Sequence, residues 1–255
     1  MLKKINDLCA GAVYPSSLVT NGAFWTEGDN VTPLCPHRFY AKAGANRLII
    51  FLHSWSADMS QVTSQTELTS IDRVVIGAPN FGGSNSASGL MYSDAAIDEI
   101  HEAILLLKKK TQLERVYLIA FSGGTNAALS YMGKYPGMIH RTSLWLPIYD
   151  LALLYSHTSD NSLKTDMVNK IGHAPIDLND ADYLARSAKS RLPNISGDTT
   201  IYINTGTTDT VSPKVHGELA RDAIGTSCDV IYKEWNIGHV FTSTERNEAI
   251  KQLLD

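Results

Sequence analysis

One segment of ten residues constrains the fold more than any other part of the chain. It reads Tyr117-Leu-Ile-Ala-Phe-Ser122-Gly-Gly-Thr-Asn, an apolar run that leads into a serine between small residues. The apolar run is typical of a buried strand, and the two glycines predict a sharp turn into a helix. Such a turn leaves no room for large side chains two residues before and after the serine, where the chain has Ala120 and Gly124. The segment therefore predicts a serine presented at the end of a central strand.

The rest of the chain alternates between strand and helix patterns. Most of the strand-like runs are continuously apolar, as expected for buried parallel strands. A helix is predicted over 93–110, where isoleucine and leucine recur at helical spacing, acidic residues fill the first half and three lysines end it. The alternation predicts an α/β fold, a mostly parallel, doubly wound sheet with helices on both faces. The expected strands of this sheet are 47–53, 73–78, 115–121, 142–147, 200–205 and 229–235.

A chain of 255 residues with this pattern is expected to form a single domain over 1–255. Residues 1–45 indicate an antiparallel entry to the sheet that ends in a strand at 38–41. The segment 151–197 is polar and of mixed helical character, and it interrupts the strand and helix rhythm. We expect it to form a lid or cap insertion over the active site.

Charge and apolar runs argue against two classes of partner. A formal net charge of −4 offers no basic field for a nucleic acid. The longest apolar run, 116–121, is six residues long, whereas a membrane-spanning helix needs about 20. No apolar stretch follows the first lysines, so no signal peptide is expected; this slightly favours the cytoplasm and leaves localisation and oligomeric state open.

No cofactor or metal is expected. The three cysteines, Cys9, Cys35 and Cys228, are odd in number and widely spaced, which leaves a bridge between Cys9 and Cys35 open. The glycine-rich segment 79–89 lacks the spacing of a nucleotide-binding loop, and no zinc-ligand spacing occurs.

A serine hydroxyl is a weak nucleophile that needs an imidazole to accept its proton and a carboxylate to orient that imidazole. Asp209 directly follows an expected strand, and His239 follows the next one. Because neighbouring parallel strands end at one edge of the sheet, both loops should meet there. Asp150, which follows the strand before, is the rival acid, and a helix-capping role also explains it. His216 lies within a predicted helix, 213–224, where we expect it on the surface.

An oxyanion formed at this serine would need two backbone N–H donors. Gly123 follows the serine at the start of a helix and is one candidate. The second is Trp55, or alternatively Ser54, in Phe51-Leu-His53-Ser-Trp55-Ser. His53 is expected to be structural.

With these residues assembled, the chain resembles the α/β-hydrolase superfamily from about residue 38 to its end. It looks most similar to prolyl-oligopeptidase-like hydrolases and to small feruloyl or acetyl esterases. The resemblance rests on Ser122 in Phe-Ser-Gly-Gly, Asp209 in Thr-Asp-Thr-Val-Ser-Pro and His239 in Gly-His-Val-Phe. The chain departs from the family pattern at Ala120 and Ser54, where glycine is usual.

The resemblance implies a serine esterase that acts on a small-molecule carboxylic ester through an acyl-enzyme intermediate. Ester cleavage is favoured over peptide cleavage because 255 residues leave no room for the large N-terminal domain of long-chain oligopeptidases. Two alternatives stay open. One is a peptidase or amidase with the same three residues, and the other is a non-catalytic binding protein on a hydrolase fold.

Overall fold

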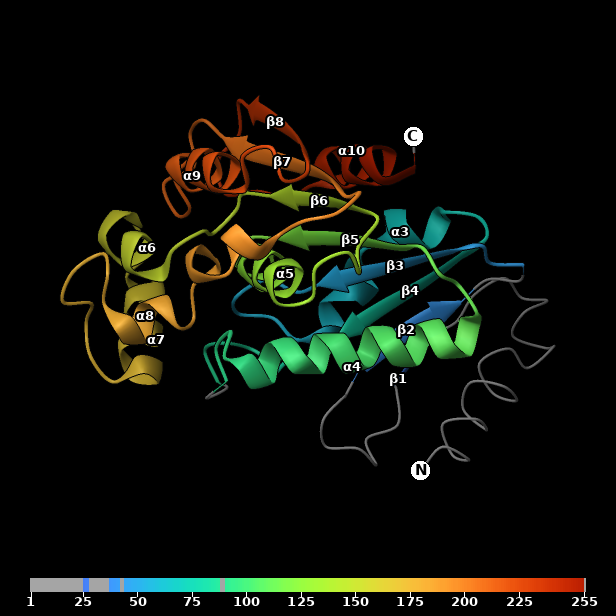
Figure 1. Cartoon of the computed structure of the whole chain (residues 1–255), viewed down its shortest axis with the longest axis horizontal. Helices are drawn as coiled ribbons and strands as arrows, with labels where there is room; N and C mark the ends of the chain where they lie inside the picture. The colour runs from blue at the N-terminus through green and yellow to red at the C-terminus, as the bar shows by residue number, and fades with distance from the viewer. Residues whose placement is uncertain (1–24, 28–36, 42–43, 88–89, 255) are drawn as a thin grey trace.

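The computed structural model describes residues 25–27, 37–41, 44–87 and 90–254 (Figure 1). Its centre is an eight-stranded sheet with the strand order β1-β2-β4-β3-β5-β6-β7-β8. Strands β1 and β2 are antiparallel to their neighbours, and all other neighbours pair in parallel. The strands are β1 (Trp25–Glu27), β2 (His37–Ala41), β3 (Arg47–Leu52), β4 (Val74–Pro79), β5 (Val116–Phe121), β6 (Arg141–Trp145), β7 (Thr200–Gly206) and β8 (Asp229–Trp235).

The fold class predicted from the sequence is confirmed, and every expected strand is present with its ends shifted by two residues or fewer. The antiparallel entry is also confirmed, since β1 and β2 lie at one edge of the sheet. Strand β8 forms the opposite edge, where its side chains are mostly exposed or half-buried.

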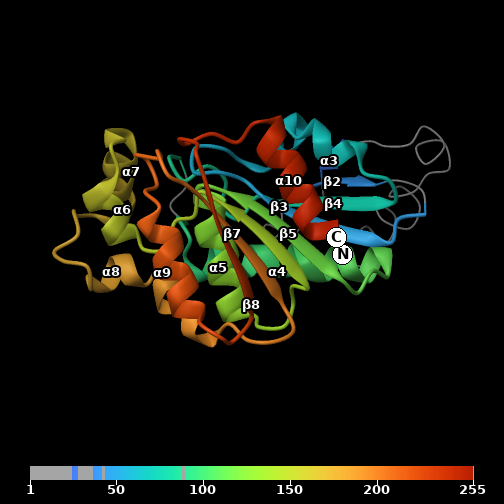
Figure 2. The same cartoon turned by 90° about the horizontal axis from the view of Figure 1, so that it is seen from above.

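Helices cover both faces of the sheet (Figures 1 and 2). Side chains alternate between the faces, so Leu48 and Ile50 of β3 belong to one buried cluster while Ile49 and Phe51 belong to the other. All four are at most 1% exposed, and full burial of each such side chain stabilises the fold by about 1.5–3 kcal/mol. The main helices packed on the sheet are α4 (Asp94–Thr111), α5 (Gly123–Lys134), α9 (Val215–Ile224) and α10 (Ser243–Leu254), and the short helix α3 (Thr66–Ser70) packs against α10.

Helix α4 matches the predicted helix within one residue at each end. Ser93 caps its start by accepting a hydrogen bond from the amide of Ala96, and Gln112 ends it in a left-handed conformation with φ 58°. The apolar face read from the sequence, which includes Ile97, Ile100 and Ile104, is fully buried.

The segment between β6 and β7 has two parts. Helices α6 (Leu151–His157), α7 (Asn161–Ile171) and α8 (Ala181–Leu184) lie together beyond the carboxyl ends of the parallel strands, to the left in Figure 1. The short 3-10 helices η3 (Ala188–Ser190) and η4 (Leu192–Asn194) pack against α5. Both parts contribute to the same buried cluster, for example Leu154 and Met167 from the first and Ala188 and Leu192 from the second. That the segment 151–197 forms a lid or cap insertion stays a prediction.

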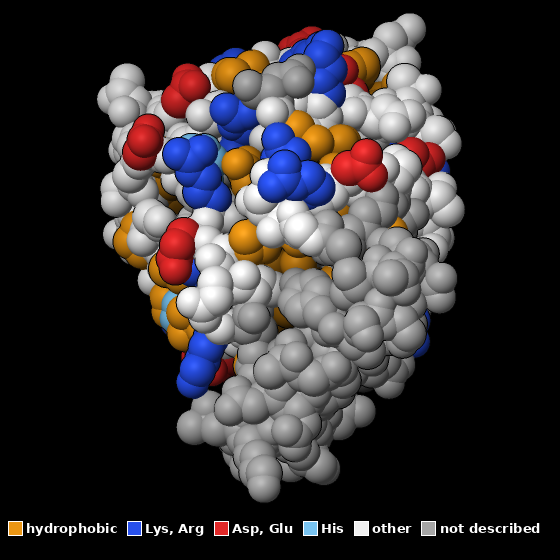
Figure 3. Space-filling model, turned by 90° about the vertical axis from the view of Figure 1, so that its right-hand side faces the viewer, with side chains coloured by type: hydrophobic (Ala, Val, Ile, Leu, Met, Phe, Trp, Pro, Cys, Tyr) orange, Lys and Arg blue, Asp and Glu red, His pale blue; other side chains and the backbone are white. Residues whose placement is uncertain are grey.

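None of the described helices combines the length and the apolar character that a membrane span requires. Cys9 and Cys35 lie outside the described residues, and Cys228 is a free, partly buried thiol. Figure 3 shows the end of the molecule on the right of Figure 1, where Lys and Arg side chains are interspersed with Asp and Glu.

Candidate active site

Ser122 stands between β5 and α5 in a backbone conformation that few residues other than glycine adopt. Its φ is 52° and its ψ is −124°. The amide of Ser122 donates to the carbonyl of Trp145 at the end of the neighbouring strand, 2.9 Å away. Strained backbone of this kind costs on the order of 1–3 kcal/mol and is concentrated at functional sites.

The two glycines after Ser122 are required by close packing. A Cβ on Gly124 would lie 2.4 Å from the carbonyl oxygen of Leu52, and one on Gly123 would lie 2.8 Å from the amide nitrogen of Trp55. Both partners belong to the end of β3 or to the loop that follows it. The start of α5 is therefore pressed directly against that loop, which explains why small residues follow the serine.

The structure brings Ser122, His239 and Asp209 together. Ser122 Oγ lies 2.9 Å from His239 Nε2, and His239 Nδ1 lies 2.8 Å from Asp209 Oδ2. A carboxylate can only accept, so Nδ1 carries the proton and Nε2 presents its lone pair to the serine. Asp209 follows β7 and His239 follows β8, which are neighbours in the sheet.

Asp209 is held rigidly by its second oxygen. Asp209 Oδ1 accepts hydrogen bonds from the amides of Val211 and Ser212, at 2.8 and 2.9 Å. Its side chain has no exposed surface, whereas the side chain of His239 is 20% exposed. The arrangement keeps the carboxylate in place on the protein side and leaves the imidazole open to a substrate.

Two backbone N–H groups lie beside the serine without an acceptor in the described part of the chain. They belong to Gly123, the first residue of α5, and to Trp55. The alternative donor, Ser54, is already engaged, because its amide donates to Gln61 Oε1 at 2.8 Å. The fully buried hydroxyl of Tyr92 also lies against Gly123 and has no hydrogen-bond partner among the described residues.

His53 has the contacts of a structural residue. Its ring nitrogens lie 2.9 Å from the carbonyl oxygens of Ser54 and Asn80, and its ring stacks on Phe81 at 3.9 Å. Burial lowers the pKa of His53. It fixes the loop that carries Trp55.

Asp150, the rival acid, is engaged at the start of α6. It caps α6, where its Oδ1 accepts from the amides of Ala152 and Leu153, and its Oδ2 pairs with Lys189 Nζ at 2.9 Å. These contacts account for both oxygens of the carboxylate.

The prediction that His216 lies on the surface is wrong. The residue is fully buried, its Nδ1 accepts from the amide of Tyr149 at 3.2 Å, and burial lowers its pKa to about 3. It faces inward because α9 packs on β7 through residues spaced four apart, His216, Ala220 and Ile224. That spacing is visible in the sequence and indicates the buried face.

An open pocket of about 200 Å³ lies in front of Ser122 and His239. Asp160, the N-cap of α7, and Leu163 of α7 were not among the predicted site residues, because they reach the pocket only through the tertiary fold. Phe121 forms another part of the wall, with its ring 5.4 Å from that of His239. The lining residues are Ser54, Trp55, Ser56, Phe121, Ser122, Asp160, Leu163, Val211 and His239.

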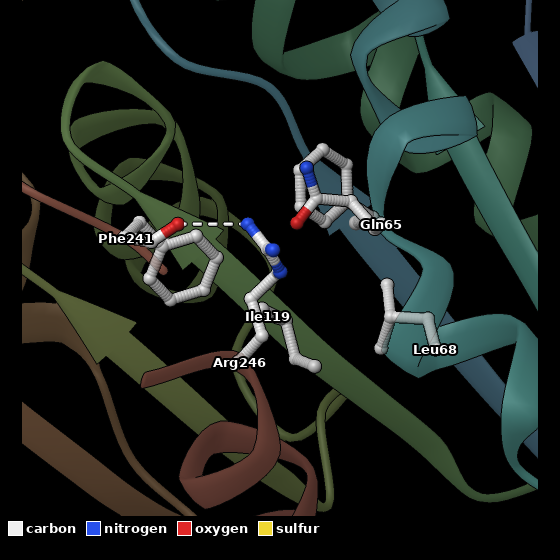
Figure 4. A pocket seen from close by; sticks show the side chains of 6 residues that line it. Gln65, Leu68, Ile119, Phe241 and Arg246 are labelled. Atoms are coloured by element: carbon white, nitrogen blue, oxygen red, sulfur yellow. Dashed lines mark hydrogen bonds between the residues drawn. The ribbon is translucent and has the colours of Figure 1, made fainter. Parts of the chain in front are cut away.

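A second hollow lies between α3 and α10 (Figure 4) and is too narrow to hold a water molecule. On its rim Arg246 donates to the carbonyl of Phe241 at 2.8 Å and to Glu67 at 2.6 Å. The ring of Phe241 stacks on Phe121 at 4.8 Å. The hollow therefore belongs to the packing that supports the pocket wall.

One group of side chains in the described residues has ligand atoms close enough for a metal ion, all within 4.8 Å of one another. It consists of His173, Asp180 and Asp182, near α8. Asp180 caps α8, and His173 Nε2 lies 3.1 Å from Asp182 Oδ2. These mutual contacts explain the cluster without an ion. In the glycine-rich loop, the amide of Gly82 donates to Glu99 rather than facing an open anion site.

Comparison with known proteins identifies the architecture. No family model matches the sequence, and no curated protein matches it. Solved structures do match, among them an acylaminoacyl peptidase from Pyrococcus horikoshii with TM-score 0.65 and 14% identity, over 91% of this chain and 39% of the other. A post-proline cleaving enzyme from Rickettsia typhi matches with TM-score 0.69 and 14% identity, over 91% of this chain and 37% of the other.

An S-formylglutathione hydrolase from Agrobacterium tumefaciens matches with TM-score 0.64 and 14% identity, over 91% of this chain and 95% of the other. The chain has the α/β-hydrolase fold. It spans roughly two fifths of the length of the two peptidases but nearly the whole hydrolase. At this level of identity the fold is what these proteins share with the chain.

Proposed function

We propose that this chain is a serine hydrolase that cleaves small carboxylic esters through an acyl-enzyme intermediate. The observation that carries the proposal is the continuous hydrogen-bonded series from Ser122 through His239 to Asp209, with distances of 2.9 and 2.8 Å. Ser122 and His239 line an open pocket, so a substrate carbonyl can reach the serine.

In the first half-reaction Ser122 Oγ attacks the ester carbonyl carbon while His239 Nε2 takes the hydroxyl proton. The carbonyl oxygen becomes an anion, and the amides of Gly123 and Trp55 donate to it. His239 then gives its proton to the departing alcohol oxygen, which leaves an ester between the acyl group and Ser122.

In the second half-reaction a water molecule attacks the acyl carbon and loses its proton to His239 Nε2. Collapse of this second intermediate returns the proton to Ser122 and releases the carboxylic acid. Asp209 stays ionised throughout, holds the imidazole in one tautomer and stabilises the imidazolium that forms in each half-reaction.

Ester cleavage and peptide cleavage are both reactions that this set of residues can carry out. The S-formylglutathione hydrolase, matched over 95% of its length, supports ester cleavage as the first candidate. The peptidases are matched over 39% and 37% of theirs. A peptidase or amidase that uses the same residues is the second candidate, supported by the peptidase neighbours.

The test is hydrolysis of 4-nitrophenyl esters with acetyl, butyryl, long-chain and feruloyl groups, compared with aminoacyl 4-nitroanilides. We expect ester turnover that Ser122→Ala lowers by at least about 10³-fold. The matched control is Ser130→Ala, which removes a buried hydroxyl on the same helix. Faster anilide cleavage would favour the peptidase, and no turnover of either class would favour a binding protein.

A further inference from the structure

Among the described residues, Asp160 is the one carboxylate in the wall of the pocket that holds Ser122 and His239. The nine lining residues include no lysine and no arginine. Hydrogen bonds, above all from the Ser162 side chain, lower the pKa of Asp160, so it is negatively charged at neutral pH. The pocket therefore carries a negative charge that no side chain of its wall neutralises, apart from His239 when it is protonated.

The capping of α7 does not require a negatively charged residue at position 160. Among the described residues, the amide and hydroxyl of Ser162 and the amide of Leu163 donate to the same oxygen, Asp160 Oδ1. Asparagine caps a helix as well as aspartate does, because the cap requires one acceptor oxygen. None of these three hydrogen bonds uses the second oxygen, Oδ2, so it is available to a ligand.

A second carboxylate lies just behind the pocket on the same helix. Asp166 Oδ2 accepts from Trp55 Nε1 at 2.9 Å, and Trp55 is itself part of the wall. The negative charge of the wall thus favours a cationic ligand, such as an ammonium group.

We infer that Asp160 makes the enzyme selective for esters that carry a positive charge near the scissile bond, and that it disfavours anionic esters. This inference rests on the proposed function, since it concerns the substrate class of the same site. The charge can lie on the acyl side or on the alcohol side. In a solvated pocket this attraction should raise kcat/KM for a cationic ester about tenfold over that for a neutral ester of the same shape.

The test compares neutral and cationic esters of the same shape. On the acyl side these are 4-nitrophenyl heptanoate and 4-nitrophenyl 6-aminohexanoate, with the adipate monoester as the anion. On the alcohol side they are 3,3-dimethylbutyl acetate and acetylcholine. The measured quantity is the ratio of kcat/KM between charged and neutral esters, in the wild type, in Asp160→Asn and in Asp177→Asn.

We expect the cationic ester of at least one pair to be preferred about tenfold and the anionic ester to be the poorest, with both differences shrinking at high salt. Asp160→Asn should bring the ratio close to one. Asp177→Asn should not change it, because Asp177 is an exposed carboxylate between α7 and α8 that does not line the pocket.

Equal rates for neutral and cationic esters in both pairs, or a preference that survives in Asp160→Asn, would overturn the inference. Either result leaves the proposed function standing, because neutral esters would still be hydrolysed by a protein that needs Ser122. Failure to hydrolyse any ester would instead overturn the proposed function and this inference with it.

Discussion

The indole of Trp55 donates its Nε1 hydrogen to Asp166 Oδ2 at 2.9 Å, and this bond joins the loop after β3 to helix α7. Trp55 is 3% exposed, so the bond is largely shielded from water. The same residue offers its backbone N–H beside Ser122. The position of α7 and the geometry of the candidate oxyanion site are thus linked through one side chain.

Asp166→Ala should loosen α7, because it leaves the buried indole N–H without an acceptor at a cost of about 1–3 kcal/mol. Hydrogen exchange should become faster in α7 and in the loop that carries Trp55, while the strands keep their protection. Asp166→Asn, which retains an acceptor oxygen, is the conservative control and should stay close to the wild type. Unchanged exchange in Asp166→Ala would show that the bond does not hold the helix.

Asp209→Asn should lower kcat by roughly 10³ to 10⁴-fold without unfolding the protein, because asparagine favours the wrong imidazole tautomer. Asp150→Asn should have little effect on kcat, since asparagine can still cap α6; it loses only the pairing with Lys189. Steady-state kinetics and thermal melts of the two variants separate these effects. A larger loss of kcat in Asp150→Asn, with folding intact, would reassign the acid.

Gly124→Ala should destabilise the fold severely. The added methyl would lie 2.4 Å from the Leu52 carbonyl oxygen and 2.7 Å from that of His53, and backbone cannot give way as a side chain can. We expect a loss of at least about 3 kcal/mol or failure to fold. Gly137→Asn, at an open position with φ 76°, is the control and should cost far less, since asparagine tolerates that conformation. Comparable urea unfolding midpoints for the two variants would contradict the packing described here.

Because of His216, the free energy of unfolding should decrease as the pH is lowered. Burial lowers the pKa of His216 to about 3 in the folded protein, against about 6.5 for an ordinary histidine in the unfolded chain. Between these values the unfolded state binds the extra proton, so this residue decreases the free energy of unfolding by up to about 1.4 kcal/mol per pH unit as the pH drops. Above about pH 6.5 its titration has no effect on stability.

His216→Gln removes this titration and keeps an oxygen that can accept from the amide of Tyr149. Urea unfolding at several values between pH 4 and 7 should therefore show a shallower pH dependence for the variant. Parallel curves for the variant and the wild type would mean that His216 does not titrate between the two states.

Much of the fold could be predicted because its signals are local. Buried parallel strands are continuous apolar runs, and the turn at Ser122 requires small neighbours whatever surrounds it. The spacing of Asp209 and His239 after adjacent strands also follows from chain order and sheet topology.

What could not be predicted depends on contacts between distant segments. Asp160 and Leu163 reach the pocket because α7 packs over the end of the sheet, and their local sequence shows only a helix cap. The packing of η3 and η4 against α5 is a second example, because the polar composition of this segment does not reveal it. The surface position predicted for His216 is wrong because it rests on the polarity of histidine alone, whereas His216 shares the buried face of α9 with Ala220 and Ile224.

The most direct test of the central claim is labelling of the folded protein with a fluorophosphonate, read by intact mass and peptide mapping. An activated serine forms a covalent adduct, whereas an ordinary hydroxyl does not. We predict one adduct on Ser122, absent in Ser122→Ala, reduced in Asp209→Asn and lost when the protein is unfolded. A folded protein that gives no adduct, or gives one at a residue other than Ser122, would contradict the account.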